Sequence, residues 1–197
     1  MDNIFNNEAS KYWGPNHTVL PTIPGKKAPA LAKWQHYIDN VPSADNQKQW
    51  LDQYGHCGIA VNMGKKMSNG YHLMAIDVDT DEHVGMAKRI FGPVISGKRG
   101  KKGITVFALY EKDQFKKKSS VKIHGYEKGI DILIRGSYCI CPPTIHPETN
   151  KPYEWIGKPL YECDPNELRV ITKTEIDLLK DILALPEHQV LLDGQST

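Results

Sequence analysis

Two aspartates separated by one residue, Asp77 and Asp79, lie in the apolar segment of residues 73–80. Ile76 and Val78 favour a buried strand here, and a turn sequence precedes it. Because side chains alternate across a strand, both carboxylates leave one face and the two β-branched residues leave the other. Neighbouring carboxylates repel each other, and burying one without a partner is costly. A pair of divalent cations, about 3.5–4 Å apart in phosphoryl-transfer sites, would offset that repulsion.

A simpler interpretation of the same residues stays open. Asp77 can end a strand, while Asp79 or Thr80 caps a helix that begins near residue 81. An Asp-x-Asp pattern alone does not separate this structural role from metal binding.

A third acid lies in a second alternating segment, residues 129–136. There Asp131, Leu133 and Arg135 share one face of the expected strand, and three isoleucines share the other. The structural alternative is a salt bridge between Asp131 and Arg135 or another cation. Either way, the segment predicts a carboxylate on an otherwise apolar strand.

A basic, glycine-rich segment lies between these acids, at residues 95–103. Its cations are Lys98, Arg99, Lys101 and Lys102, and an apolar strand with Thr105 as its polar position follows. Glycines let backbone N–H groups approach an anion closely, and the cations offset its charge. Charge runs are also common on solvated surfaces, so for this loop alone the two interpretations are about even. The solvated interpretation is favoured for Lys116–Lys118, and for Lys26 and Lys27 when these are taken in isolation.

Length and composition describe an ordinary globular protein. The chain has 197 residues, of which 40% are hydrophobic and 24% charged, so it is long enough for one well-packed domain. Its net charge of +2 is too small to imply a polyanionic partner without a local basic patch. Four cysteines without a Cys-x-x-Cys pair predict neither a disulfide framework nor a structural zinc site. With no long apolar run and no signal pattern, a cytoplasmic protein without membrane contact is expected.

The expected strands come in runs between helices, which predicts an α+β fold with a mixed, mainly antiparallel sheet flanked by helices. Helices are expected at residues 4–13, 43–54, 84–91 and 172–185, and strands at residues 58–61, 73–80, 103–110, 129–136, 137–141 and 153–156. A short polar turn between the first two strands favours an antiparallel pair. We expect a domain at residues 1–165 and a C-terminal helix and tail at 166–197, with residues 189–197 as a tail or linker to a further domain.

The order and spacing of these motifs resemble a known family. A Gly-Lys-Lys-x-Pro…Lys-Trp-Gln segment, a strand before the Asp-x-Asp strand, and a glycine-rich loop leading into a strand follow one another. The run from Gly129-Ile130-Asp131 through Pro142-Pro143-Thr144 to Tyr153-Glu154-Trp155 completes the pattern. Over residues 21–155 the chain resembles the archaeo-eukaryotic primase superfamily, and more closely the bifunctional primase–polymerases of plasmids, phages and mobile elements.

The resemblance implies an RRM-like primase–polymerase core that acts as a DNA primase or DNA polymerase by a two-metal mechanism. By analogy, Asp77, Asp79 and Asp131 would bind two Mg²⁺ or Mn²⁺ ions and carry the catalysis. Phosphate or nucleotide contacts would come from Lys98, Arg99, Lys101, Lys102, Thr105 and Arg135, and nucleic-acid contacts from Lys26, Lys27 and Lys33. The implied partners are single-stranded DNA template, primer, nucleoside triphosphates and a helicase in the same or another chain.

One position departs from the family pattern. The family carries a nucleotide-contacting histidine on the strand after the glycine-rich loop, where this chain has Thr105. A threonine hydroxyl can donate one hydrogen bond to phosphate but brings no imidazole. His72, His124 and His146 could replace it in space, although an ordinary loop or strand histidine is the favoured interpretation of each. The departure favours one alternative, a weakened primase-like module that binds nucleic acid or recruits a helicase. A metal-dependent phosphodiesterase that uses the same acids to cleave is a third hypothesis, with little support from the motifs.

Overall fold

The computed structural model describes residues 3–127 and 129–186 of the chain. It confirms the α+β fold. The α-helices are α1 (Ile4–Glu8), α2 (Ala44–Tyr54), α3 (Val84–Phe91) and α4 (Lys173–Ala184), and the 3₁₀ turns are η1 (Ala9–Tyr12), η2 (Trp34–Ile38), η3 (Lys112–Gln114), η4 (Leu160–Glu162) and η5 (Pro165–Glu167). The strands are β1 (Val19–Thr22), β2 (Gly58–Asn62), β3 (His72–Val78), β4 (Ser96–Arg99), β5 (Ile104–Tyr110), β6 (Ser119–Val121), β7 (Ile130–Leu133), β8 (Tyr138–Cys141) and β9 (Glu154–Gly157).

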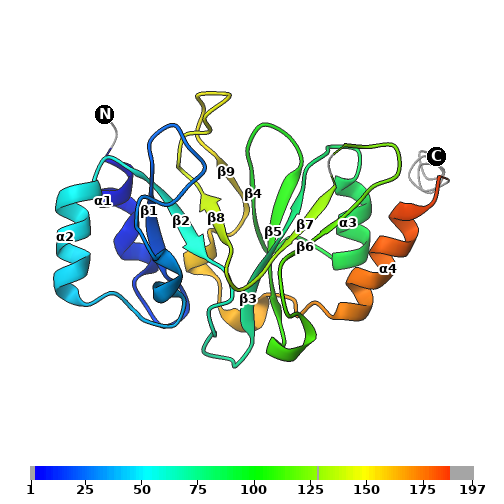
Figure 1. Cartoon of the computed structure of the whole chain (residues 1–197), viewed down its shortest axis with the longest axis horizontal. Coiled ribbons are helices and arrows are strands. Elements are labelled where there is room, and N and C mark those ends of the chain that lie inside the picture. Colours follow the sequence, from blue (N-terminus) through cyan, green and yellow to red (C-terminus); the bar gives the residue numbers. More distant parts are fainter. Residues whose placement is uncertain (1–2, 128, 187–197) are drawn as a thin grey trace.

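The strands form two sheets that stand side by side (Figure 1). The smaller sheet has the order β1-β2-β8, and the larger has the order β6-β7-β3-β5-β4-β9. Every pairing between these strands is antiparallel. Helices α1 and α2 lie beside the smaller sheet, while α3 and α4 lie beside the larger one (Figure 1). No helix among the described residues is long and apolar enough to cross a membrane.

The expected antiparallel pair of β2 and β3 is wrong. Strand β2 pairs with β1 and β8 in the smaller sheet, whereas β3 pairs with β5 and β7 in the larger one. The intervening segment carries only a short hairpin of its own, in which Lys66 bridges to His72. A polar turn indicates a reversal of the chain, but it does not determine which strand each neighbour pairs with.

The helix boundaries follow from local capping chemistry. The Ser43 hydroxyl accepts a hydrogen bond from the Asn46 N–H at the start of α2. Thr172 and Glu175 form a capping box at the start of α4, as their spacing predicts. Helix α4 buries Ile176, Leu179 and Leu183 in the core beside the larger sheet. The division of the chain at residue 165 stays a prediction, and the expected tail at residues 189–197 lies outside the described residues.

Strand β3 separates two apolar cores, as its alternation predicts. Met74, Ile76 and Val78 are buried in the core beneath α3 and α4. Leu73 and Ala75 face the other core, which the N-terminal helices and the smaller sheet share. Asp77 follows in the same alternation and therefore leaves the face that looks toward the smaller sheet.

Candidate active site

Five polar side chains form a row across the larger sheet. Strand register places Lys98 opposite Thr105, Thr105 opposite Asp77, and Asp77 opposite Asp131, which in turn lies opposite Ser120. The Cβ atoms of directly opposite residues in antiparallel strands are about 4.5–5.5 Å apart. The register therefore brings together a cation, two acids and two hydroxyls that the sequence spreads over 55 positions (Asp77 to Asp131, counted inclusively).

Each aspartate in this row accepts a hydrogen bond from the hydroxyl beside it. The Thr105 Oγ1 donates to Asp77 Oδ1 at 2.5 Å, and the Ser120 Oγ donates to Asp131 Oδ1. Thr105 is 2% exposed, so its only hydroxyl proton is committed to the carboxylate. The structure therefore gives Thr105 a role in orienting Asp77, where the sequence led us to expect contact with phosphate.

Asp79 lies just beyond the end of β3 and belongs to the same side of the sheet. Its backbone N–H donates to the Gly129 carbonyl at 3.2 Å, which holds it next to the start of β7. Within residues 3–127 and 129–186, no three His, Cys, Asp or Glu side chains already converge closely enough to hold a metal ion. Metal binding by Asp77, Asp79 and Asp131 would therefore require these carboxylates to turn toward a shared centre.

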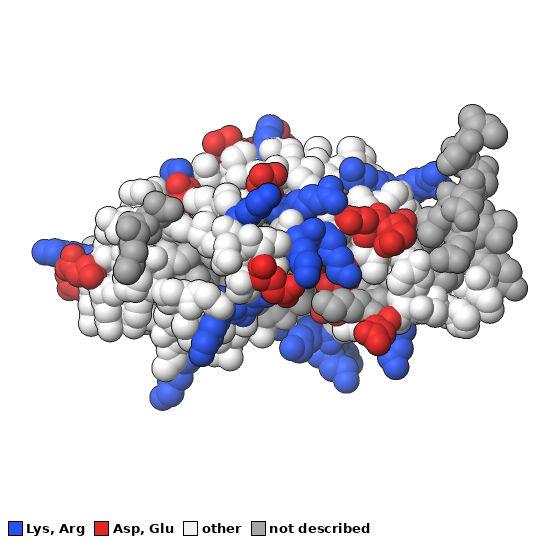
Figure 2. All heavy atoms as spheres, turned by 90° about the horizontal axis from the view of Figure 1, so that it is seen from above, with Lys and Arg blue, Asp and Glu red and all other residues white. Residues whose placement is uncertain are grey.

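An open cavity of about 550 Å³ collects most of the expected site residues. All three aspartates line it, and so do Lys98, Lys101, Lys102, Thr105 and Lys27. Its other lining side chains include Lys118, Ser137, Tyr138, Cys139, His146, Glu148 and Tyr153. Charged groups of both signs gather on the face onto which the β4–β5 and β8–β9 loops open (Figure 2). The cavity is suited to a multiply charged anion that is bound together with cations.

Lys98 is a buried cation within this cavity. It is 7% exposed, and its Nζ lies 4.6 Å from the centre of the Tyr153 ring. Burial lowers the pKa of the ammonium, whereas the neighbouring Cys139 and Asp77 raise it, and the net direction is upward. In the described part of the chain no carboxylate oxygen lies within ion-pair distance of Lys98. The cavity thus holds a charged donor with unused capacity for an anion.

The rest of the basic loop is tied to the protein by acids. Asp81 Oδ1 accepts from the Arg99 guanidinium at 2.7 Å and from the Gly103 N–H at 2.9 Å. Lys101 donates to Glu148 at 3.0 Å. Arg99, which was expected to contact phosphate, does not line the cavity. Its ion pair with Asp81 anchors the loop instead. Both ion pairs are about half exposed, so solvent screening leaves each of them only a small contribution to stability.

Gly103 permits the close approach of this loop to β3. Its φ is +66°, and a Cβ at this position would lie 1.8 Å from the Val78 carbonyl oxygen. We expect Gly103→Ala to destabilise the protein by roughly 2–4 kcal/mol, from the left-handed backbone and the overpacking together. Gly70→Ala is the control, because Gly70 also has a positive φ of +92° but has open space around it. Chemical denaturation checks both; equal losses for the two variants would contradict the close-contact argument.

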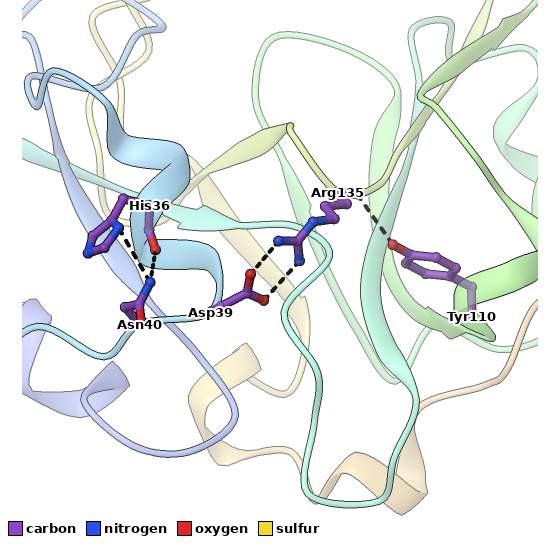
Figure 3. A network of polar contacts seen from close by, with 5 residues as sticks. All are labelled: His36, Asp39, Asn40, Tyr110 and Arg135. Atoms are coloured by element: carbon purple, nitrogen blue, oxygen red, sulfur yellow. Dashed lines mark hydrogen bonds and ion pairs between the residues drawn. The ribbon is translucent and has the colours of Figure 1, made fainter.

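Arg135 does not line the cavity, and its side chain points toward Asp39 (Figure 3). Its guanidinium makes a two-pronged ion pair with Asp39, and its backbone N–H donates to the Tyr110 hydroxyl at 3.4 Å. The Arg135 side chain lowers the pKa of the Asp39 carboxyl through this hydrogen-bonded pair. Arg135 follows β7 in a turn, so it no longer shares the face of Asp131, and the salt bridge between the two that the sequence left open is not formed.

We expect Arg135→Gln to lower the free energy of unfolding by at most about 1 kcal/mol, because the ion pair is exposed. Its effect on the KM for nucleotide should stay within about twofold. Denaturation curves and initial-rate kinetics measure the two quantities. A large rise in KM with unchanged stability would contradict this and would indicate that Arg135 contacts the nucleotide, as the resemblance implies.

Of the three lysines expected to contact nucleic acid, one lines the cavity and two lie outside it. Lys27 lines the cavity, and its carbonyl accepts a hydrogen bond from the Tyr138 hydroxyl at 2.9 Å. Lys26 and Lys33 are exposed outside it. In the opposite direction, Lys118 lines the cavity although its lysine run favoured a solvated loop. Lys118 immediately precedes β6, in which Ser120 pairs with Asp131, and this pairing leaves no local signal in the sequence.

The fold and this cavity define an α+β domain with acids and cations arranged around one open cavity. A family model described as bifunctional DNA primase/polymerase, N-terminal (Prim-Pol), matches residues 9–169. The match covers most of the chain, so the protein belongs to the Prim-Pol family, which confirms the resemblance seen in its motifs. Membership indicates nucleotidyl transfer of the primase/polymerase type, with DNA and nucleotides as substrates. No curated protein matches the chain.

Proposed function

We propose that this domain joins nucleotides on a single-stranded DNA template, as a primase, a polymerase or both, by a two-metal mechanism. The observation that carries the proposal is the row from Lys98 to Asp131, because it places two acids and a buried cation in one cavity. The motif resemblance adds the setting, which is replication of a mobile element, with a helicase in the same or another chain as a partner.

The residues present fit the implied metals. Asp77, Asp79 and Asp131 supply only carboxylate oxygens, which are the ligands that Mg²⁺ and Mn²⁺ prefer. The like charges of Asp77 and Asp131 lie opposite each other across one strand pair, an arrangement that bound cations would stabilise. Two such ions, when bound, would activate a primer 3′-hydroxyl and stabilise charge on the α-phosphate and the departing pyrophosphate.

The chain's own residues would then divide the work by position. Thr105 and Ser120 orient the carboxylates of Asp77 and Asp131 through the hydrogen bonds described above. Lys98 offers its charge where Tyr153 holds the ammonium in place, and Lys101 and Lys102 extend the positive region along the loop. Such preorganised donors neutralise the charge of a triphosphate without moving during the reaction.

Primer extension on a single-stranded template tests the proposal. The wild-type protein should extend a labelled primer with Mg²⁺ or Mn²⁺ and either dNTPs or NTPs, and EDTA should abolish the reaction. The Asp77→Ala/Asp79→Ala variant should be inactive while it remains folded. A wild-type protein that binds the template but extends no primer under any of these conditions would overturn the proposal.

One observation favours a second function, that of a nucleic-acid-binding module with weakened catalysis. The Thr105 hydroxyl is engaged by Asp77, so the strand position that carries a histidine elsewhere in the family offers the nucleotide no donor here. Thr105→His separates the two functions. A gain in extension rate over the wild type would show an active site that lacks one contact, whereas no extension by either the wild type or the variant, with template binding intact, would support the binding module.

A further inference from the structure

His146 is a buried histidine that lines the cavity from the β8–β9 loop. It is 3% exposed, and its ring lies 5.0 Å from the ring of Tyr153, centre to centre. Of the other two histidines considered from the sequence, His72 packs near Tyr110 and His124 is exposed, and neither lines the cavity. The structure therefore singles out one imidazole at the site.

The hydrogen bond of His146 determines where its proton lies. The backbone N–H of Glu148 donates to His146 Nδ1 at 3.2 Å. A backbone N–H can only donate, so Nδ1 carries a lone pair and the proton of the neutral ring is on Nε2. Burial first, and then the nearby Lys27, lower the pKa of His146, which also favours the neutral ring.

The Nε2 side of the ring lies toward the basic loop. A Cβ placed on Gly100 would lie 3.0 Å from His146 Cδ2, the carbon bonded to Nε2, and 2.6 Å from Tyr153 Cε1. The basic loop thus packs against the rings of His146 and Tyr153 at Gly100, where the absence of a side chain allows the close contact. Lys98 lies against the same tyrosine ring, 4.6 Å from its centre. A neutral N–H donor and a charged donor are consequently both held against one aromatic residue that lines the cavity.

We propose that His146 is a nucleotide-binding residue whose Nε2–H donates a hydrogen bond to a phosphate oxygen of a bound nucleoside triphosphate, next to Lys98. This inference rests on the proposed function for the identity of the ligand. It assigns to the β8–β9 loop a contact that β5 does not provide, because the Thr105 hydroxyl there is engaged by Asp77. The Lys101–Glu148 ion pair joins the two loops that would enclose the phosphates.

Two substitutions separate binding from a purely structural role. In His146→Asn the side-chain oxygen can still accept from the Glu148 N–H, but nothing reaches the place of Nε2. In His146→Gln the amide N–H can reach that place, while the Nδ1 acceptor is lost. His124→Asn is the matched control, since His124 is exposed and outside the cavity.

The measurements are calorimetric titrations of each protein with Mg²⁺–dATP and with Mg²⁺–tripolyphosphate, and unfolding midpoints without ligand. We expect His146→Asn to weaken both ligands about tenfold, as loss of a hydrogen bond to a charged group does, with an unchanged midpoint. His146→Gln should recover part of the affinity, and His124→Asn should match the wild type.

Several outcomes would overturn the proposal. If His146 has only a structural role, the order of the two variants is reversed. His146→Asn then has the ligand affinity and the unfolding midpoint of the wild type, whereas His146→Gln has a lowered unfolding midpoint. Loss of dATP affinity alone, with tripolyphosphate binding unchanged, would place the contact at the nucleoside rather than the phosphates. A wild-type protein that binds neither ligand also removes the inference. A protein that binds both ligands as expected but extends no primer refutes only the proposed polymerase activity.

Discussion

Replacing Asp77 with Asn is expected to reduce the rate of primer extension by at least about a thousandfold and to leave the metal-free protein equally stable or slightly more stable. The rate falls because an uncharged amide replaces a carboxylate ligand of a metal-dependent reaction, whose charge stabilisation is worth several kcal/mol. Stability is kept because the Asn oxygen can still accept the hydrogen bond from Thr105. It can rise by a few tenths of a kcal/mol because the charge repulsion with Asp131 opposite is removed.

Primer extension and denaturation in EDTA measure the two effects, and Asp181→Asn on the exposed side of α4 is the control. The combination is informative, because a residue that served only the fold would lose stability when substituted. Full extension activity in Asp77→Asn would contradict the assignment of this strand as the catalytic one. A large loss of stability would show instead that the hydrogen bond from Thr105 stabilises the fold only when the residue at position 77 is a charged carboxylate.

Lys98→Met is expected to raise the KM for nucleotide by about ten- to a hundredfold, since a charge-assisted hydrogen bond to phosphate is worth roughly 1.5–3 kcal/mol. Met keeps the apolar stem against Tyr153 and removes a buried charge that has no carboxylate within ion-pair distance in the described part of the chain. The unfolding midpoint should therefore stay the same or rise, because replacing a buried charge by an apolar group of similar volume is often neutral or stabilising.

Steady-state kinetics at saturating primer–template give the KM, and Lys88→Met on the exposed face of α3 is the matched control. An unchanged KM in Lys98→Met would show that the phosphates bind elsewhere, along Lys101 and Lys102. An equal rise in the control would indicate a general effect of net charge on nucleic-acid binding rather than a contact in the cavity.

The local features of this protein were accessible from the sequence because they depend on neighbouring residues. Capping residues located the starts of α2 and α4, and the period-two pattern of β3 assigned Asp77 to the face opposite Ile76. The order of the motifs was sufficient for the family, which the model match over residues 9–169 confirms. The three acids were also identified as a set, although their convergence in one cavity depends on pairings that alternation does not specify.

Strand register, which sequence patterns leave open, created the site. Alternation assigns each side chain to a face, but only the pairing of β4, β5, β3 and β7 aligns Lys98, Thr105, Asp77 and Asp131 in a row. The same reason explains why the expected antiparallel pair of β2 and β3 does not form. The turn after β2 does not reveal that the chain crosses to the other sheet.

The charged residues show the same limit. Arg135 leaves the site because its strand ends two residues earlier and Asp39, 96 positions away, offers a partner. His146 enters the site because a loop from the smaller sheet's β8 meets the glycine at position 100 of the larger sheet's basic loop. Local sequence thus determined the elements and the family. Contacts between residues far apart in the chain determined which cations and which imidazole line the same cavity as the acids. Those long-range contacts depend on how the two sheets pack, which local sequence does not specify.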